Sequence, residues 1–108
     1  MDLVALARTD PAAFVALLAD PKDLSAIDLG FAAELALEVR EPSPAGALMK
    51  LLEHPAATVR AGAAIGAEGH TTWAMHAVLV RASVLDADPG VRRYASESAG
   101  RMYRRLAR

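Results

Sequence analysis

Three histidines are the residues best suited to bind a metal ion, but their spacing argues against that chemistry. His54, His70 and His76 stand 16 and 6 residues apart. A zinc-binding helix places two histidines four residues apart, on one face. We expect His54 and His70 at opposite ends of one helix, pointing to opposite edges. The sequence therefore predicts no metal site.

The five serines and the carboxylates give no nucleophilic site. No serine lies in a Gly-x-Ser-x-Gly turn, and no Ser–His–Asp arrangement is suggested. The chain has no cysteine, which removes thiolate catalysis, thiolate metal ligands and disulfides. The spacing of Gly62 and Gly66 is typical of close helix packing rather than of a phosphate-binding loop. We predict a protein that is not an enzyme and holds no cofactor.

The composition indicates one small helical domain over residues 1–108. Hydrophobic residues make up 54% of the chain, many of them alanine, and aromatic residues only 5%. Closely packed helices use alanine in this way, whereas strands concentrate β-branched and aromatic residues. No apolar run approaches the roughly 18 residues that span a bilayer, and the charged start at 1–8 is unlike a signal peptide. We expect a cytoplasmic protein.

Prolines and capping residues divide the chain into helices. Asp10-Pro11 and Ser43-Pro44 each give an N-cap residue followed by proline at the first helical position. After a short helix or extended lead-in at 2–8, the pattern predicts three pairs of helices, at about 11–19 and 25–39, 44–53 and 58–68, and 72–85 and 91–108. One apolar face is expected to carry Ile27, Phe31, Leu35 and Val39, which follow one another at i+4 steps.

A unit of 32 residues recurs along the chain. Ile27, Val59 and Val91 are each 32 residues apart, and each is expected to anchor the second helix of a pair against the first. The residues that follow these anchors are Asp28, Arg60 and Arg92, and small residues come after them. A fixed period near 32 that covers a helix–turn–helix unit is typical of a solenoid.

The unit resembles the HEAT repeat family, especially the short bacterial HEAT-like repeats also found in phycobilin lyases. The stretch Asp88-Pro89-Gly90-Val91-Arg92, continued to Gly100, fits the repeat nearly throughout, and His54-Pro55 to Ala67 fits well. The first unit is degenerate, with Asp28 where the arginine belongs. The resemblance implies a short right-handed α-solenoid of about three helical hairpins, at 10–40, 43–69 and 71–108.

The resemblance also implies a role for the arginines that follow Val59 and Val91. In this family such an arginine takes part in an Asp–Arg ladder between repeats. We expect structural contacts between repeats from Arg60, Arg92 and Asp88, with Arg60 reaching across to Asp86 or Asp88.

In such solenoids the second helix of each pair lines the concave face. The outward positions there would carry Leu29 and Ala33, Ala61 and Ile65, then Arg93 and Glu97. An exposed apolar strip over two repeats would mark a protein-binding or dimer surface. A rotation of the helices would instead make Leu29, Leu37 and Ile65 part of the core. Both alternatives stay open at this point.

The last helix carries a basic face formed by Arg93, Arg101 and Arg104 or Arg105, with Glu97 among them. One interpretation is a docking patch for an acidic protein or a nucleic acid, and the other is a solvated end cap of the solenoid. Only Tyr94 and Tyr103 interleave with the arginines, and the pI is about 6.3. Both observations argue against general nucleic-acid binding.

We expect a protein-interaction or scaffold module with a protein partner of unknown identity, and the alternative is a nucleic-acid binder that uses the basic last helix. Residues 1–42 hold eight acidic and three basic residues, whereas residues 81–108 hold seven arginines and three acidic residues. These opposite charges also suggest head-to-tail or dimeric association. A role related to bilin lyases would rest on the repeat resemblance alone, because no bilin-holding residue can be assigned.

Overall fold

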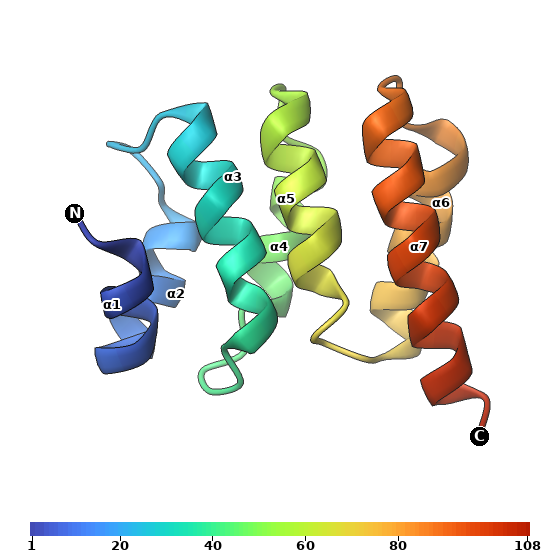
Figure 1. Cartoon of the computed structure of the whole chain (residues 1–108), viewed down its shortest axis with the longest axis horizontal. Helices are drawn as coiled ribbons and strands as arrows, with labels where there is room; N and C mark the ends of the chain where they lie inside the picture. Colours follow the sequence, from blue (N-terminus) through green and yellow to red (C-terminus); the bar gives the residue numbers. More distant parts are fainter.

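The chain folds entirely into helices (Figure 1). The computed structural model describes residues 1–108 and contains seven α-helices, one short 3₁₀-helix and no strand. In chain order the elements are α1 (Leu3–Thr9), α2 (Pro11–Ala19), α3 (Ala26–Leu35), η1 (Ala36–Glu38), α4 (Ala45–Leu51), α5 (Ala57–Ala67), α6 (Trp73–Leu85) and α7 (Pro89–Leu106). The predicted all-α class is confirmed, and the lead-in at 2–8 is a helix. None of the helices has both the length and the apolar content needed to cross a membrane.

Side-chain caps begin five of the helices. The Asp10 carboxylate accepts a hydrogen bond from the backbone N–H of Ala13, and the Asp88 carboxylate accepts one from Val91. These caps satisfy N–H groups that have no partner inside the helix. The other three are Asp2, Ser25 and Thr72, which cap α1, α3 and α6. Because Asp88 caps α7, that helix begins at Pro89, two residues earlier than predicted.

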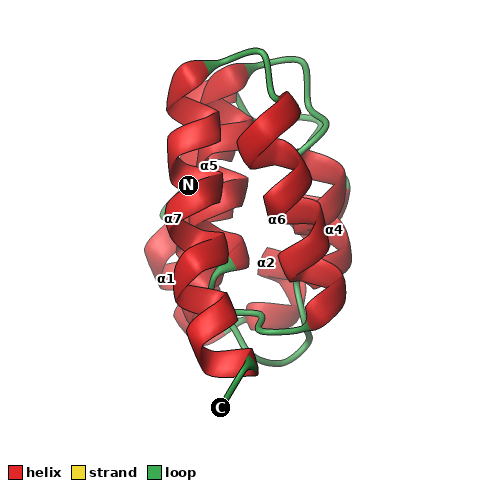
Figure 2. Cartoon of the chain, turned by 90° about the vertical axis from the view of Figure 1, so that its right-hand side faces the viewer, coloured by secondary structure: helices red, strands yellow, loops and turns green.

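The helices form two layers, which Figure 2 shows edge-on. α1, α3, α5 and α7 lie in one layer, and α2, α4 and α6 lie in the other (Figures 1 and 2). The chain changes layer with each successive α-helix. The predicted pairs α4–α5 and α6–α7 pack together, whereas α2 packs more closely on α1 than on α3. Within the first layer, α3 lies beside α5 and α5 beside α7. The molecule measures 35 × 30 × 17 Å.

The core lies between the layers and consists of aliphatic, aromatic and small side chains. Its largest fully buried members include Phe14, Leu18, Leu48, Met75 and Leu79 from the second layer, and Val59, Val91 and Met102 from the first. Between these side chains the first layer contributes mainly alanines, such as Ala32, Ala63 and Ala95. Small residues opposite large ones let the two layers interdigitate.

Glycines bring α3 and α5 into backbone contact. A Cβ atom at Gly62 would overlap the carbonyl oxygen of Gly30, and one at Gly66 would overlap that of Ala33. No side chain fits between the two helices at these positions. The interpretation of Gly62-x-x-x-Gly66 as a close-packing element is therefore confirmed. Since the helices touch along their backbones, their relative position is fixed tightly.

The rotation of α3 differs from the prediction. Ile27 and Phe31, expected on the apolar face with Leu35, are 75% and 46% exposed, whereas Leu29 is 2% exposed and Ala33 is fully buried. Gly30 must face α5 to make its backbone contact, and this turns the neighbouring Leu29 and Ala33 inward. Leu29 thus corresponds to Val59, 30 residues later rather than 32. The expectation that Ile27 is a buried anchor like Val59 and Val91 is therefore wrong, although Gly30 and Gly62, which meet at the helix contact, keep the spacing of 32 residues.

Candidate protein-binding surface

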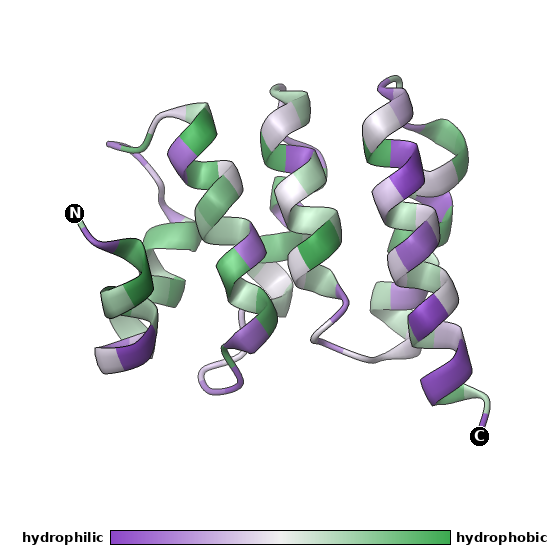
Figure 3. Ribbon diagram, in the orientation of Figure 1, coloured by the Kyte–Doolittle hydropathy of each residue, from purple (hydrophilic) through white to green (hydrophobic).

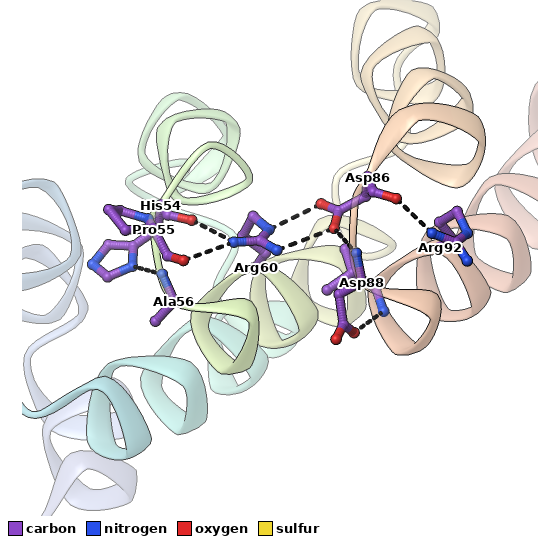
Figure 4. A network of polar contacts seen from close by, with 8 residues as sticks. His54, Pro55, Ala56, Arg60, Asp86, Asp88 and Arg92 are labelled. Carbon is purple, nitrogen blue, oxygen red and sulfur yellow. Dashed lines mark hydrogen bonds and ion pairs between the residues drawn. The ribbon is translucent and has the colours of Figure 1, made fainter.

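A polar network joins the turn before α5 to the turn before α7 (Figure 4). The Arg60 guanidinium donates from Nε to Oδ2 of Asp86 at 2.9 Å and from Nη2 to Oδ1 at 3.1 Å. Its Nη1 donates to the carbonyl oxygens of His54 and Pro55 at 2.9 and 3.0 Å. Both charged side chains are largely buried, at 16% and 7% exposure. The two-pronged geometry is the strongest form of an arginine–carboxylate pair.

Asp86 is held in its charged form. Burial raises the pKa of this carboxyl, but hydrogen bonds from Arg60 and from the backbone N–H of Asp88, with the charges of Arg60 and Arg92, lower it below its ordinary value. A carboxylate bound by this many donors is a poor proton acceptor. We therefore assign the network a structural task, which is to hold two neighbouring hairpins in register.

The other two residues expected between repeats act locally. Arg92 donates from Nη1 to the backbone carbonyl oxygen of Asp86 at 2.7 Å, within the turn that precedes its own helix. The carboxylate of Asp88 caps α7 through the N–H of Val91 at 3.0 Å. Of the three residues, only Arg60 spans two hairpins, and its partner is Asp86. The expectation of contacts between repeats is therefore wrong for Arg92 and Asp88, whose hydrogen bonds lie within their own hairpin.

A second set of contacts ties α7 to the end of α5. Glu68, whose side chain is 13% exposed, accepts from Arg101 and from Arg105 Nη2, and Arg105 Nη1 also donates to its backbone carbonyl at 3.0 Å. His70 Nε2 lies 2.8 Å from the carbonyl oxygen of Ala36 at the end of α3. Arg101 and Arg105, predicted to bind a partner, thus bind Glu68. This contact reduces the charge that they offer to a ligand.

A shallow groove crosses the outer face of the first layer, where α3, α5 and α7 meet solvent. It has a volume of about 380 Å³ and is lined by Ile27, Gly30, Phe31, Glu34, Thr58, Ala61, Gly62, Ile65 and Tyr94. Ile27, Phe31 and Tyr94 are 75%, 46% and 41% exposed. Figure 3 shows hydrophobic residues along the α3 and α5 side of this face and mostly hydrophilic ones along α7. The groove therefore offers an apolar strip with a polar border.

The remaining predicted partner-binding residues lie at different places. Ile65 is half-buried in the groove wall. On α7, Arg93 and Glu97 are exposed and pair with each other at 3.1 Å, and Arg104 is exposed. Leu29 and Ala33 are buried, so their assignment to an exposed strip is wrong.

The sequence predicted an apolar strip on this face, but the α3 residues exposed there are Ile27 and Phe31 rather than Leu29 and Ala33. Ile27 and Phe31 stand four residues apart, three residues before and one residue after Gly30. The missed signal was Gly30 itself. A glycine in α3 at the level of Gly62 in α5 marks the buried side of the helix, and large residues flanking that side then face solvent. Tyr94 of α7 lines the same groove.

The three histidines lie apart from one another's possible metal-binding partners. No group of three or more histidine, cysteine or acidic side chains lies close enough together to hold a metal ion. His54 uses Nδ1 to accept a hydrogen bond from the N–H of Ala56 at 3.0 Å, which fixes the turn before α5. No protein-family model, curated protein or solved structure matches the chain.

Proposed function

We propose that this chain is a non-enzymatic protein-interaction module of the cytoplasm, built as a short α-solenoid of HEAT-like repeats. The groove formed by α3, α5 and α7 would bind an apolar segment of a partner protein. The observation that carries this proposal is the exposure of Ile27, Phe31 and Tyr94 around one groove. Large apolar side chains that gather at one exposed place are typical of a binding surface.

The shape of the groove favours a helix as its occupant. The floor has no side chains at Gly30 and Gly62, and the walls are formed by Phe31, Ile65 and Tyr94. An amphipathic helix binds such a groove by inserting apolar residues spaced three and four positions apart. The groove runs across neighbouring helices of one layer, so a bound helix would contact all three hairpins.

The charges beside the groove favour a partner with a defined orientation. Asp28 and Glu34 are exposed on α3, and Arg93 is exposed on α7. A partner helix with basic residues along one border of its apolar face and acidic residues along the other would match both sides. Charges of this kind influence orientation and association rate more than affinity.

The test compares two substitutions of the same type on different surfaces. Phe31→Glu places a charge in the groove wall, and Val80→Glu places one on α6, far from the groove. Partners captured from a native lysate are identified by mass spectrometry, and their binding is measured with purified proteins. We expect Phe31→Glu to weaken binding about 10- to 100-fold, because an apolar anchor is lost.

The matched control decides where the partner binds. Val80→Glu should leave the affinity per chain unchanged, and circular dichroism should give the same helix content for all three proteins. A partner that binds wild type and Phe31→Glu equally would contradict the proposal. If a partner binds Phe31→Glu like wild type but no longer binds Val80→Glu, its binding site lies on α6 instead.

A further inference from the structure

α6 is apolar on nearly every side, although one side faces solvent. Among its 13 residues only Arg81 carries a full charge. Met75 and Leu79 are fully buried in the core, while Trp73, Val80 and Val84 are 52%, 41% and 69% exposed. A helix that is hydrophobic all round is normally covered on all sides. The exposed side of α6 therefore lacks a cover in the isolated chain.

Four exposed residues of α6 form one stripe at the end of the molecule, and Arg81 and Leu85 are exposed beside it. Trp73, Ala77, Val80 and Val84 follow at steps of four, three and four residues, on the side of α6 away from Met75 and Leu79. This spacing keeps the four side chains on one helical face. Figure 2 shows that α6 and α7 lie side by side at this end. The end of a repeat array is normally polar, whereas this stripe carries no charged side chain.

α7 continues the uncharged surface beside the stripe. The ring centroid of Tyr103 lies 6.1 Å from that of Trp73 and 5.8 Å from that of His76, and Tyr103 is 53% exposed. One turn earlier, Gly100 has open space where a Cβ atom would stand. The end face thus combines large side chains on α6 with an open position on α7.

We propose that a second copy of this chain covers the α6 stripe, giving a two-fold symmetric dimer. The steps between the four stripe residues, of four, three and four positions, are the same counted from either end of α6. When two α6 helices pack antiparallel, Trp73 faces Val84 of the second copy and Ala77 faces its Val80. A two-fold interface requires such self-complementarity, since each residue must fit its counterpart. Large residues then meet smaller ones along the whole stripe.

Charge and area agree with a second copy as the occupant. The four stripe residues are uncharged, so two copies bring no like charges together at the centre. The end face spans two of the molecular dimensions, 30 × 17 Å, or about 500 Å² in projection. That is of the order of the roughly 800 Å² that each partner buries in a standard interface. This inference concerns a surface separate from the groove and does not depend on the groove's function.

Sedimentation equilibrium over a concentration series tests the dimer. Wild type should approach twice the chain mass of 11.4 kDa, and Val80→Glu should raise the dimer dissociation constant about 100-fold or more, because it buries a charge at the centre. Ile27→Glu, the matched control in the groove, should dimerise like wild type. The only tryptophan is Trp73, so its emission should shift to the blue as the dimer forms.

A thiol at position 77 tests the symmetry. The chain has no cysteine, and Ala77→Cys would give each copy one thiol near the two-fold axis. A short bismaleimide should then link the two copies covalently. Wild type that stays monomeric throughout the series, or Val80→Glu that dimerises equally well, would overturn the proposal. Dimers that form but are not cross-linked through position 77 would also overturn it, because a head-to-tail contact or another region would then hold the copies together.

Discussion

At the scale of single residues, Arg60 and Asp86 link α5 to the turn before α7 through a pair that is largely buried. All three nitrogen atoms of the guanidinium have acceptors, in the Asp86 carboxylate and in two carbonyls of the preceding turn. The Val-Arg repeat predicted that Arg60 reaches the turn at 86–88, but not which carboxylate it binds. In the structure the Asp88 carboxylate caps α7 through the N–H of Val91, and the Asp86 carboxylate accepts the hydrogen bonds from Arg60.

We predict that Asp86→Asn lowers stability at neutral pH by about 1–2 kcal/mol, because charged hydrogen bonds become neutral ones. The pKa of Asp86 lies below its unfolded value of about 3.9. Wild type therefore has this contribution fully above about pH 4 and loses it as the pH falls through the folded pKa. Urea unfolding at several pH values should show the difference between wild type and Asp86→Asn shrinking in acid.

Asp23→Asn is the control for this measurement, because Asp23 is exposed. The stability of this variant should vary with pH as that of wild type does. A difference between Asp86→Asn and wild type that stays constant down to about pH 2 would contradict the assignment, since the contribution would then not depend on ionisation of Asp86.

At the scale of elements, the helices were predictable and the rotation of α3 was not. The Asp-Pro and Ser-Pro pairs mark helix starts locally, so most boundaries fall within two or three residues of the prediction. α3 offers apolar residues on two faces, Ile27 with Phe31 and Leu29 with Ala33. The contact that chooses between them is made by Gly30 against α5. An alignment at a period of 32 pairs Gly30 with Gly62, but it does not show which side of α3 this contact buries.

We predict opposite effects from two glycine-to-alanine changes. Gly66→Ala should destabilise the protein by about 1–3 kcal/mol or more, because its Cβ would overlap the carbonyl oxygen of Ala33 and push the helices apart. Gly46→Ala in α4 meets no atom within 4 Å. It should be neutral or stabilise by up to about 1 kcal/mol through helix propensity. Urea unfolding measures both, and equal effects of the two changes would contradict the backbone contact.

At the scale of the whole molecule, the two exposed apolar surfaces face different directions. The groove with Phe31 lies on the outer face of the first layer, and the stripe with Val80 lies at the α6–α7 end. A dimer formed through the stripe leaves both grooves open, so one assembly would present two equivalent binding sites. The acidic start and basic end of the chain suggest a different, head-to-tail mode, which depends on charge.

Salt separates these two modes of association. We predict that the dimer persists when NaCl is raised to about 0.5 M, because its central contacts are uncharged, whereas head-to-tail attraction would be screened at that ionic strength. Sedimentation equilibrium at low and high salt measures the difference. An assembly that dissociates as salt increases would favour contact between the oppositely charged ends.

The backbone contact between α3 and α5 has a consequence for how fast a partner can bind. Gly30 and Gly62 form the floor of the groove, and a floor without side chains has no rotamers to rearrange. The ordering cost of association then falls almost entirely on the partner. We expect one-step binding kinetics, with a rate constant in the range of about 10⁵–10⁷ M⁻¹s⁻¹ that is typical of docking between preformed surfaces. Differences in affinity among partners would accordingly appear in how long each complex lasts.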